Sequence, residues 1–174
     1  MNGRTIVLAA ALALAGIAPP VSAADFGVGA DFLDRRTILF PIRTESFLIE
    51  PEIRFNTSSS AASGGQTSSD YVPGLGVYLR KESGPQFETY WGARVGYQMS
   101  KDTVPGLELK DSTWRVTPAI GVQHFFSKQF SVGLDIGLQY STTESKTSTP
   151  TSSATGHEHG WDSIVRVLLR AYLW

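Results

Sequence analysis

The feature that most constrains this chain is an alternation of apolar and polar residues that runs far beyond the length of an ordinary strand. Residues 130–141 carry an apolar side chain at every even position from 130 to 140, and residues 86–100 do nearly the same at the odd positions. A period of two belongs to a β-strand whose two faces meet different surroundings. Because strands average about five or six residues, the two segments predict unusually long strands.

Six further segments repeat the alternation less regularly. They are residues 26–33, 36–42, 47–56, 71–80, 113–126 and 161–174. The 17 glycines and nine prolines argue against helices, because both residue types destabilise a helix interior. The pattern therefore predicts an all-β fold with eight antiparallel strands in up-and-down order.

The hydropathy of the chain excludes a bundle of transmembrane helices. Its mean is −0.07, whereas each such helix needs about 20 nearly continuous apolar residues. One short apolar run, residues 6–18, follows Arg4 and precedes the small-residue sequence Val-Ser-Ala, as in a secretory signal peptide. We expect cleavage after Ala23, with Ala24 as the alternative. Removing 23 of the 174 residues leaves 151, and residues 24–174 then form one domain.

Charge and cysteine content exclude two further classes. The formal net charge of −1 provides no basic surface for nucleic acid. The chain has no cysteine, which excludes disulfides and the residue on which a lipoprotein anchor would be built. Stability must come from burial and backbone pairing.

The predicted connections alternate between short and long. Short ones fall at 43–46, 82–85 and 127–129, and long polar ones fall at 57–70, 102–111 and 142–160. The two longest, at 57–70 and 142–160, are rich in Ser and Thr, a composition typical of solvated, mobile loops. Short turns on one side and long loops on the other are the arrangement of outer-membrane barrels.

The two faces of the strands allow two architectures. In a soluble, lipocalin-like barrel the apolar face points inward, whereas in a transmembrane β-barrel it meets lipid. The second is favoured because the apolar face has aromatic residues at its ends and aliphatic residues between them, like interfacial girdles. The predicted girdle residues are Phe47, Phe87, Phe126 and Phe130 at one rim and Phe55, Tyr71, Tyr97, Trp114, Tyr140 and Trp161 at the other.

The same assignment places charged residues of both signs inside the barrel. Buried charges persist when they are paired and hydrogen-bonded, and the arginine fork suits carboxylates. Eight strands leave an interior just wide enough for side chains, so we expect a polar plug, with a narrow channel as the alternative. The predicted interior network is Asp31, Glu50, Glu52, Glu88 and Asp135 with Arg54, Arg80, Arg94, Arg115, Arg166 and Arg170.

The signal ending Val-Ser-Ala, the eight alternating segments and a final strand IVRVLLRAYLW that ends on an aromatic residue resemble the small outer-membrane β-barrels of Gram-negative bacteria, the OmpX/Ail and OmpA-barrel type. The resemblance covers the whole mature chain. It implies a location in the outer membrane, contact with lipid and lipopolysaccharide, and a final strand read by the barrel-assembly machinery, with Tyr172 and Trp174 in the matching positions. Arg166 and Arg170 break the family's register, so either Trp174 lies past the membrane edge or a bulge shifts the phase.

Catalysis and metal binding have weak candidates. Some barrels of this size modify lipid A, so an enzyme is a competing class, but no histidine-to-serine signature of the deacylases is visible. His124 lies on the predicted lipid face, where an interfacial role is expected. His157 and His159 could chelate a metal in an extended loop but lack the i, i+4 spacing of a helical zinc motif. We expect no catalytic residue, no cofactor and no metal.

Pro51, Pro73 and Pro118 fall on the apolar face of predicted strands. Proline lacks the amide donor of the ladder, so we expect bulges or local gaps in pairing there. The sequence as a whole predicts a monomeric outer-membrane barrel with a structural role, whose loops are available for adhesion to a host or cell-surface ligand.

Overall fold

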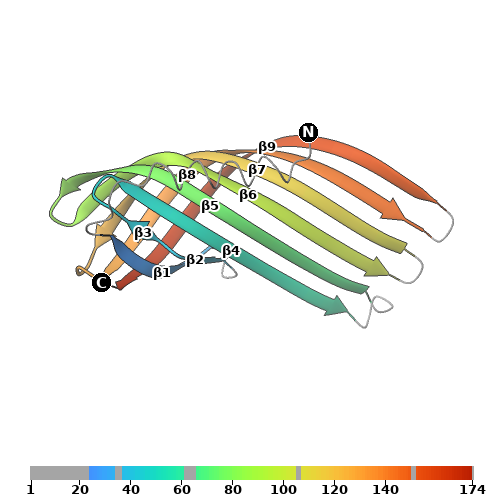
Figure 1. Cartoon of the computed structure of the whole chain (residues 1–174), viewed down its shortest axis with the longest axis horizontal. Coiled ribbons are helices and arrows are strands. Elements are labelled where there is room, and N and C mark those ends of the chain that lie inside the picture. Colours follow the sequence, from blue (N-terminus) through green and yellow to red (C-terminus); the bar gives the residue numbers. More distant parts are fainter. Residues whose placement is uncertain (1–23, 34–36, 61–65, 105–106, 150–151, 174) are drawn as a thin grey trace.

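The computed structural model describes residues 24–33, 37–60, 66–104, 107–149 and 152–173. They form one antiparallel sheet (Figure 1). Its strands are β1 (Asp25–Asp31), β2 (Thr37–Leu39), β3 (Ile42–Arg43), β4 (Phe47–Ser60), β5 (Gln66–Gly84), β6 (Phe87–Val104), β7 (Leu107–Phe125), β8 (Phe130–Ser148) and β9 (Ser153–Leu173). No helix in this part of the chain is long and apolar enough to cross a membrane.

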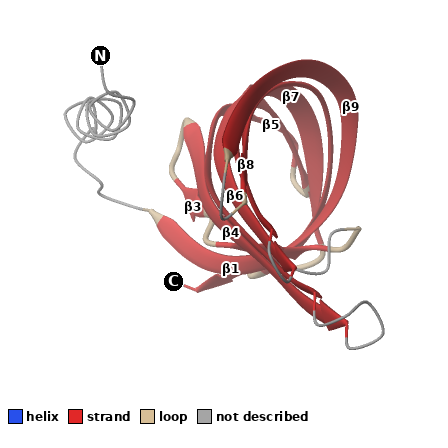
Figure 2. Cartoon of the chain, turned by 90° about the vertical axis from the view of Figure 1, so that its right-hand side faces the viewer, coloured by secondary structure: helices blue, strands red, loops and turns tan. Residues whose placement is uncertain are grey.

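The sheet closes on itself through its first and last strands. β1 pairs with β9 from Phe26 opposite Leu173 to Asp31 opposite Leu168. Every other neighbouring pair is consecutive in the chain or nearly so, and the strands curve into a ring (Figure 2). Closure satisfies the backbone groups that an open sheet leaves at its edges.

The sheet has nine strands where eight were predicted, because the single strand predicted at 36–42 is divided. β2 pairs with β4 at residues 52–54, and β3 pairs with it at residues 48 and 49. Between them the chain passes Phe40 and Pro41 opposite Pro51, which has no amide hydrogen to donate. Phe40 donates its own amide to the Pro51 carbonyl at 2.8 Å. Both short strands lie between β1 and β4.

The other two strand prolines also lie in interruptions of the ladder, as expected. Between β5 and β6 the register stops at Tyr71 opposite Met99 and resumes at Gly74, which leaves Pro73 in the gap. Between β7 and β8 it stops at Val116 and resumes at Ala119, on either side of Pro118. A missing donor at each proline accounts for the gap.

The prediction of long loops at 57–70, 102–111 and 142–160 is wrong. Most of these residues continue the strands: β4 runs to Ser60, β5 begins at Gln66, and β8 and β9 pair from Ser148 opposite Ser153 onward. In 57–70 and 142–160 the apolar alternation disappears because residues of both parities are mostly polar. Threonine is nevertheless a good strand former, and the antiparallel neighbour supplies the hydrogen bonds, so the strands continue.

Six strands extend past the closed part of the ring. β1 and β2 are short, whereas β4 to β9 continue into polar sequence on one side (Figure 1). We call this part the extension. It comprises residues 56–60, 66–70, 100–104, 107–113, 141–148 and 153–160. The turns at 44–46, 85–86 and 126–129, together with Asp25 and Leu173, lie at the opposite end, which we call the turn end.

The predicted signal peptide, residues 1–23, and Trp174 lie outside the described residues. The register of β9 with both neighbours shows no bulge from Ser153 to Leu173. In the described part of β9, the outward positions are therefore the odd-numbered apolar ones that end at Leu173.

Candidate functional site

The polar parity of the strands faces the inside of the ring, and the apolar parity faces outward. On β9, Tyr172 is 3% exposed while its neighbour Leu173 is 60% exposed. Arg170 and Arg166 are buried, while Leu169 and Val165 are exposed. A soluble domain has the opposite arrangement.

Glu88 is the centre of the interior charges near the turn end. It lies on β6 and accepts hydrogen bonds from Arg80 on β5 at 2.7 and 3.2 Å and from Gln123 on β7 at 2.7 Å. Arg43, at the end of β3, reaches it at 3.2 Å and also pairs with Asp25 at 3.3 Å. Five strands, β1, β3, β5, β6 and β7, are thereby tied to one carboxylate or its partners.

Arg170 and Glu50 form the most deeply buried pair. Both side chains are 0% exposed, and Arg170 Nε donates to Glu50 Oε2 at 2.7 Å. Arg170 also donates to Gln123 at 3.2 Å, and its guanidinium lies 5.3 Å from the centre of the Tyr90 ring. Glu50 is on β4 and Arg170 on β9, so this pair spans the ring.

Two arginines share the carboxylates of the next layer toward the extension. Arg94 donates to Asp135 at 3.0 Å and to the Tyr78 hydroxyl at 2.8 Å. Arg166 donates to Asp31 at 2.6 Å and to Glu52 at 2.8 Å, and Arg94 lies 3.3 Å from the same Glu52 oxygen. Six strands, β1, β4, β5, β6, β8 and β9, meet in this layer.

Arg54 and Arg115 lie nearer the extension and are half-buried. Arg115 donates to the Gln98 side chain, and no carboxylate of the described residues lies within ion-pairing distance of it. Arg54 is close enough to act electrostatically on Arg115. The predicted interior charges therefore form two clusters of contacts, one around Glu88 and Arg170 and one around Arg94 and Arg166, and Arg54 and Arg115 lie farther toward the extension.

Glycines on the inward face make room for this network. A Cβ added at Gly121 would overlap the ring of Tyr90, and one at Gly133 would lie 2.5 Å from Arg170 Nη1. A Cβ at Gly74 would lie 2.8 Å from the side chain of Glu52. A ring of this size holds large inward side chains only where the neighbouring strand has a small residue beside them.

Two hollows lie at opposite ends of the interior and share no lining residue. One, of about 560 Å³, is at the turn end and includes Arg43, Glu88 and Tyr172 in its wall. The other, of about 270 Å³, lies toward the extension and includes Arg94 and Arg166. Between them are the buried side chains Leu48, Tyr78, Tyr90, Glu50, Asp135, Leu168 and Arg170.

Several interior residues were missed by the prediction from charge alone. Tyr78, Tyr90 and Gln123 have the same parity as the predicted charges, so the alternation could have identified them. Tyr172 was assigned to the assembly signal, and its side chain lies inside the ring. Arg43 fell in a predicted turn. Its guanidinium stacks 4.8 Å from the centre of the Phe125 ring, a contact between distant segments that no local pattern indicates.

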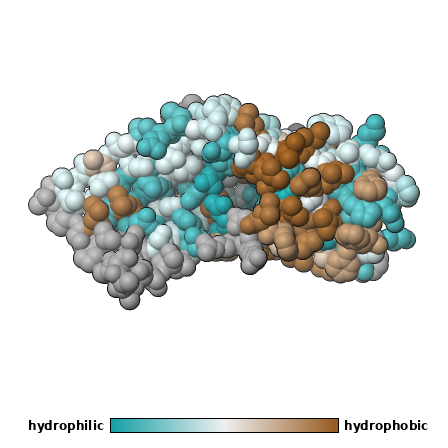
Figure 3. Space-filling view, turned by 180° about the vertical axis from the view of Figure 1, so that it is seen from behind, coloured by the Kyte–Doolittle hydropathy of each residue, from teal (hydrophilic) through white to brown (hydrophobic). Residues whose placement is uncertain are grey.

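The outward face of the closed ring is an apolar belt. Figure 3 shows apolar side chains gathered on one half of the length of the molecule and hydrophilic side chains on the other. The belt includes the exposed residues Phe26, Val28, Ile38, Leu79, Trp91, Val95, Val116, Ile120, Leu134, Ile136, Leu138, Val165 and Leu169. Soluble monomers rarely expose a contiguous apolar area of more than a few hundred Å².

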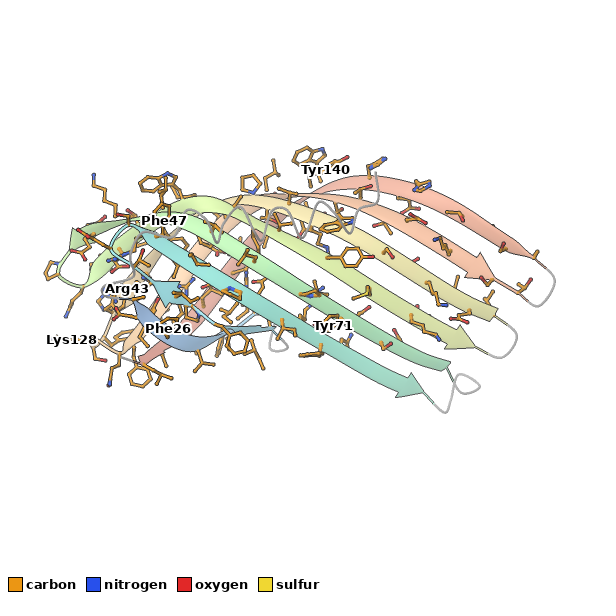
Figure 4. All side chains as sticks on the ribbon, viewed as in Figure 1. Phe26, Arg43, Phe47, Tyr71, Lys128 and Tyr140 are labelled. Atoms are coloured by element: carbon orange, nitrogen blue, oxygen red, sulfur yellow. The ribbon has the colours of Figure 1, made fainter. Side chains whose placement is uncertain are left out.

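Aromatic residues lie at both edges of the belt. Toward the extension they form cross-strand pairs, with ring centres 5.3 Å apart for Phe55 and Tyr71, 4.7 Å for Tyr97 and Trp114, and 4.9 Å for Tyr140 and Trp161. At the turn end lie Phe47, Phe87, Phe126 and Phe130. In Figure 4, Phe26 and Phe47 lie near the turn end, and Tyr71 and Tyr140 lie farther along the strands.

The three histidines are placed on the outward face. The ring of His124 contacts Phe87 and Phe126, with ring centres 4.6 and 4.9 Å apart. His159 stacks on Tyr140, and His157 lies on the same face of β9. The described residues contain no group of three or more potential metal ligands.

No protein-family model matches the chain, and no curated protein matches it. Among solved structures it is similar to a major outer membrane protein from Thermus thermophilus, with a TM-score of 0.55 and 11% identity over 87% of this chain and 100% of that one. The likeness is one of fold alone. CarO of Acinetobacter baumannii matches with a TM-score of 0.41 and 10% identity over 90% of this chain and 100% of that one, too distantly to support an argument. The OmpX/Ail resemblance remains a prediction.

Proposed function

We propose that the mature chain is an integral β-barrel of the bacterial outer membrane, monomeric and of the small OmpX/Ail type, delivered by a signal peptide at residues 1–23. In this proposal β2 and β3, which both lie between β1 and β4 in the nine-stranded sheet, count as one of eight barrel strands. The observation that carries the proposal is the apolar belt outside a charged interior. The belt has favourable surroundings in lipid, and the pairing of β1 with β9 removes the free sheet edges that lipid could not hydrogen-bond.

The interior network then acts as a structural plug. Each of the five predicted interior carboxylates contacts an arginine, and buried side chains separate the two hollows. Ions have no continuous path through such a layer. A narrow channel is the alternative, and single-channel recording in planar bilayers distinguishes the two. We expect no reproducible open level, and such a level would overturn the plug.

The same pairing argues against catalysis, because the interior carboxylates are held by arginines and the histidines lie on the outward face. We propose that the chain does not modify lipid A. Its overexpression is then expected to leave the mass spectrum of lipid A unchanged, and a new lipid A species that needs the folded protein would contradict this.

The role that remains is structural, with the polar hairpins of the extension available to a host or cell-surface ligand. In this proposal lipid and lipopolysaccharide surround the belt, and the barrel-assembly machinery inserts the chain. Shortening the hairpins β4–β5, β6–β7 and β8–β9 by paired deletions within the extension tests the surface role. Unchanged cell attachment and serum survival would remove it.

The location is tested by fractionation with heated and unheated gel samples. The proposal predicts recovery in the outer-membrane fraction and a band whose mobility changes on heating, because a closed barrel resists detergent until it is heated. Release by high salt without detergent would support a soluble barrel and contradict the proposal.

A further inference from the structure

The hollow toward the extension is richer in positive charge than the rest of the interior. It encloses about 270 Å³, and four guanidiniums and two carboxylates belong to its wall. The charged residues are Arg54, Arg94, Arg115, Arg166, Asp31 and Glu52. We call it the arginine cavity.

The two carboxylates of this cavity are already engaged. Glu52 Oε2 is held by Arg166 Nη1 at 2.8 Å and by Arg94 at 3.3 Å, and Asp31 is held by Arg166 Nε at 2.6 Å. Arg94 in addition pairs with Asp135. Both carboxylates of the wall are therefore engaged by arginines, and neither forms an ion pair with Arg115.

Three guanidinium nitrogens in the wall are buried without a hydrogen-bond acceptor among the described residues. They are Nη2 of Arg166, whose side chain is only 8% exposed, Nε of Arg115, and Nε of Arg94, which lies 3.3 Å from Glu52 Oε2 as an ion pair. A buried N–H of a charged group without a partner is costly. An oxyanion in the cavity would supply the missing acceptor, and guanidiniums bind phosphate oxygens well.

Among the described residues, the strand pairing around the ring is interrupted on one side at the level of this cavity. β1 ends its pairing with β9 at Asp31 opposite Leu168, followed by one hydrogen bond from Phe32 to Val167. Beyond Val167 toward Ser153, the edge of β9 that faces away from β8 pairs with no other described residue. β4 is in the same situation beyond Arg54, where β2 begins.

Apolar residues lie at the mouth of the cavity beside this opening. Leu33 and Val165 belong to its wall and are 62% and 53% exposed. Val165 also belongs to the belt. The exposed Trp161 lies four residues from Val165 on β9, toward the extension, and the exposed Phe55 follows the wall residue Arg54 on β4. The cavity thus has a cationic inner wall and an apolar mouth that opens sideways at the edge of the belt.

We propose that the arginine cavity binds a phosphate group, with the phosphate of an amphiphile entering sideways between β9 and β4 as its source. The anionic head contacts Arg115 and Arg166, and the apolar part remains outside against Leu33 and Val165. The lipid source rests on the proposed membrane location, whereas the phosphate site does not.

The test is isothermal titration calorimetry of the folded protein in maltoside micelles, which contain no phosphate. The probes are inorganic phosphate, dihexanoyl phosphatidic acid, and dihexanoyl glycerol as the control without phosphate. We expect saturable binding of about one phosphatidic acid per chain, weaker binding of inorganic phosphate, and none of the glycerol control.

Arg115→Gln is expected to weaken phosphatidic acid binding about tenfold or more, through loss of a charge-assisted contact. Gln139→Glu, which adds a carboxylate to the wall without removing an arginine, is expected to act in the same direction if Arg115→Gln does not fold. Lys110→Gln on the outside of the extension is the matched control and is expected to change nothing.

Equal binding of the two phosphate probes would keep the phosphate site and discard the lipid source. Absence of saturable binding of both probes, or unchanged binding in Arg115→Gln and Gln139→Glu, would overturn the site. A heat-dependent gel shift recorded on the same samples reports folding independently, so the barrel proposal can stand when the phosphate site fails.

Discussion

The interior of the ring holds single charged residues that are buried in pairs of opposite sign. Arg170 and Glu50 contact each other at 2.7 Å with no exposure to solvent. Such a pair is not automatically stabilising, because both ions lose their hydration. Removing one partner destabilises the fold, because it leaves an isolated charge where water is excluded.

Arg170→Met is therefore expected to lower the free energy of unfolding by about 3–5 kcal/mol. Adding Glu50→Gln to this variant should restore part of the loss, because the stranded charge is gone. Urea unfolding in lipid vesicles measures both. Lys146→Met, which removes an exposed partner of Glu144, is the control and should leave the midpoint unchanged. If Arg170→Met and Lys146→Met changed the free energy of unfolding by the same amount, the plug would not be a source of stability.

Gly121 gives a second test at this scale, one of space rather than charge. Its added Cβ would overlap the ring of Tyr90, which is itself fully buried. Gly121→Ala is expected to lower the free energy of unfolding by about 1–3 kcal/mol, as overpacking does. Gly156→Ala has open space around the new methyl group and should not lower it. The same vesicle unfolding assay compares the two, and stability equal to wild type for Gly121→Ala would be the contrary result.

At the scale of the elements, much of the strand pattern is predictable because alternation survives wherever the two faces meet different media. β6 and β8 are found where residues 86–100 and 130–141 predict them. The polar ends of the strands carry no such contrast, so their Ser- and Thr-rich sequence predicts loops where the structure has strands. The division into β2 and β3 was missed for another reason, because it depends on Pro51 in a neighbouring strand.

The face of each element can be tested by adding a charge. Ile136 lies in an outward row with Ile120 and Val165 in the middle of the belt. Ile136→Arg is expected to destabilise the folded protein in vesicles by about 2–4 kcal/mol, the value for arginine near the bilayer midplane. Ser148→Arg, at the exposed end of the same strand, should have no effect. Similar effects of the two substitutions would contradict the assignment of the faces.

The extension has its own electrostatic signature. Hydrogen bonds from Lys110 at 2.7 Å and Lys101 at 3.1 Å lower the pKa of Glu108 below its usual value of 4.5. Because the folded pKa is the lower one, the contribution to stability is present above pH 4.5 and is lost as the pH falls through the lowered pKa. An NMR titration should show this lowered pKa and its return toward 4.5 in Lys110→Met. An unchanged titration in the variant would contradict the contact.

At the scale of the whole molecule, a near-zero mean hydropathy conceals an outside suited to lipid and an inside of paired charges. The sequence allowed the parity of both faces to be assigned, because apolar and polar residues alternate without a break in segments such as residues 130–141. It did not reveal the open side of the ring or the arginine cavity. Both depend on where β1 stops against β9, and no local pattern contains that information.

In the proposed barrel, the belt contacts lipid while the extension contacts water. The chain has no cysteine, so single cysteines can carry a fluorophore at Ile120, Ile136 and Val165 in the belt and at Lys110 and Lys146 in the extension. In vesicles whose acyl chains carry a nitroxide quencher, we predict strong quenching at the three belt positions and little at the two extension positions. Equal quenching at all five, or none at the belt positions in folded protein, would contradict the account.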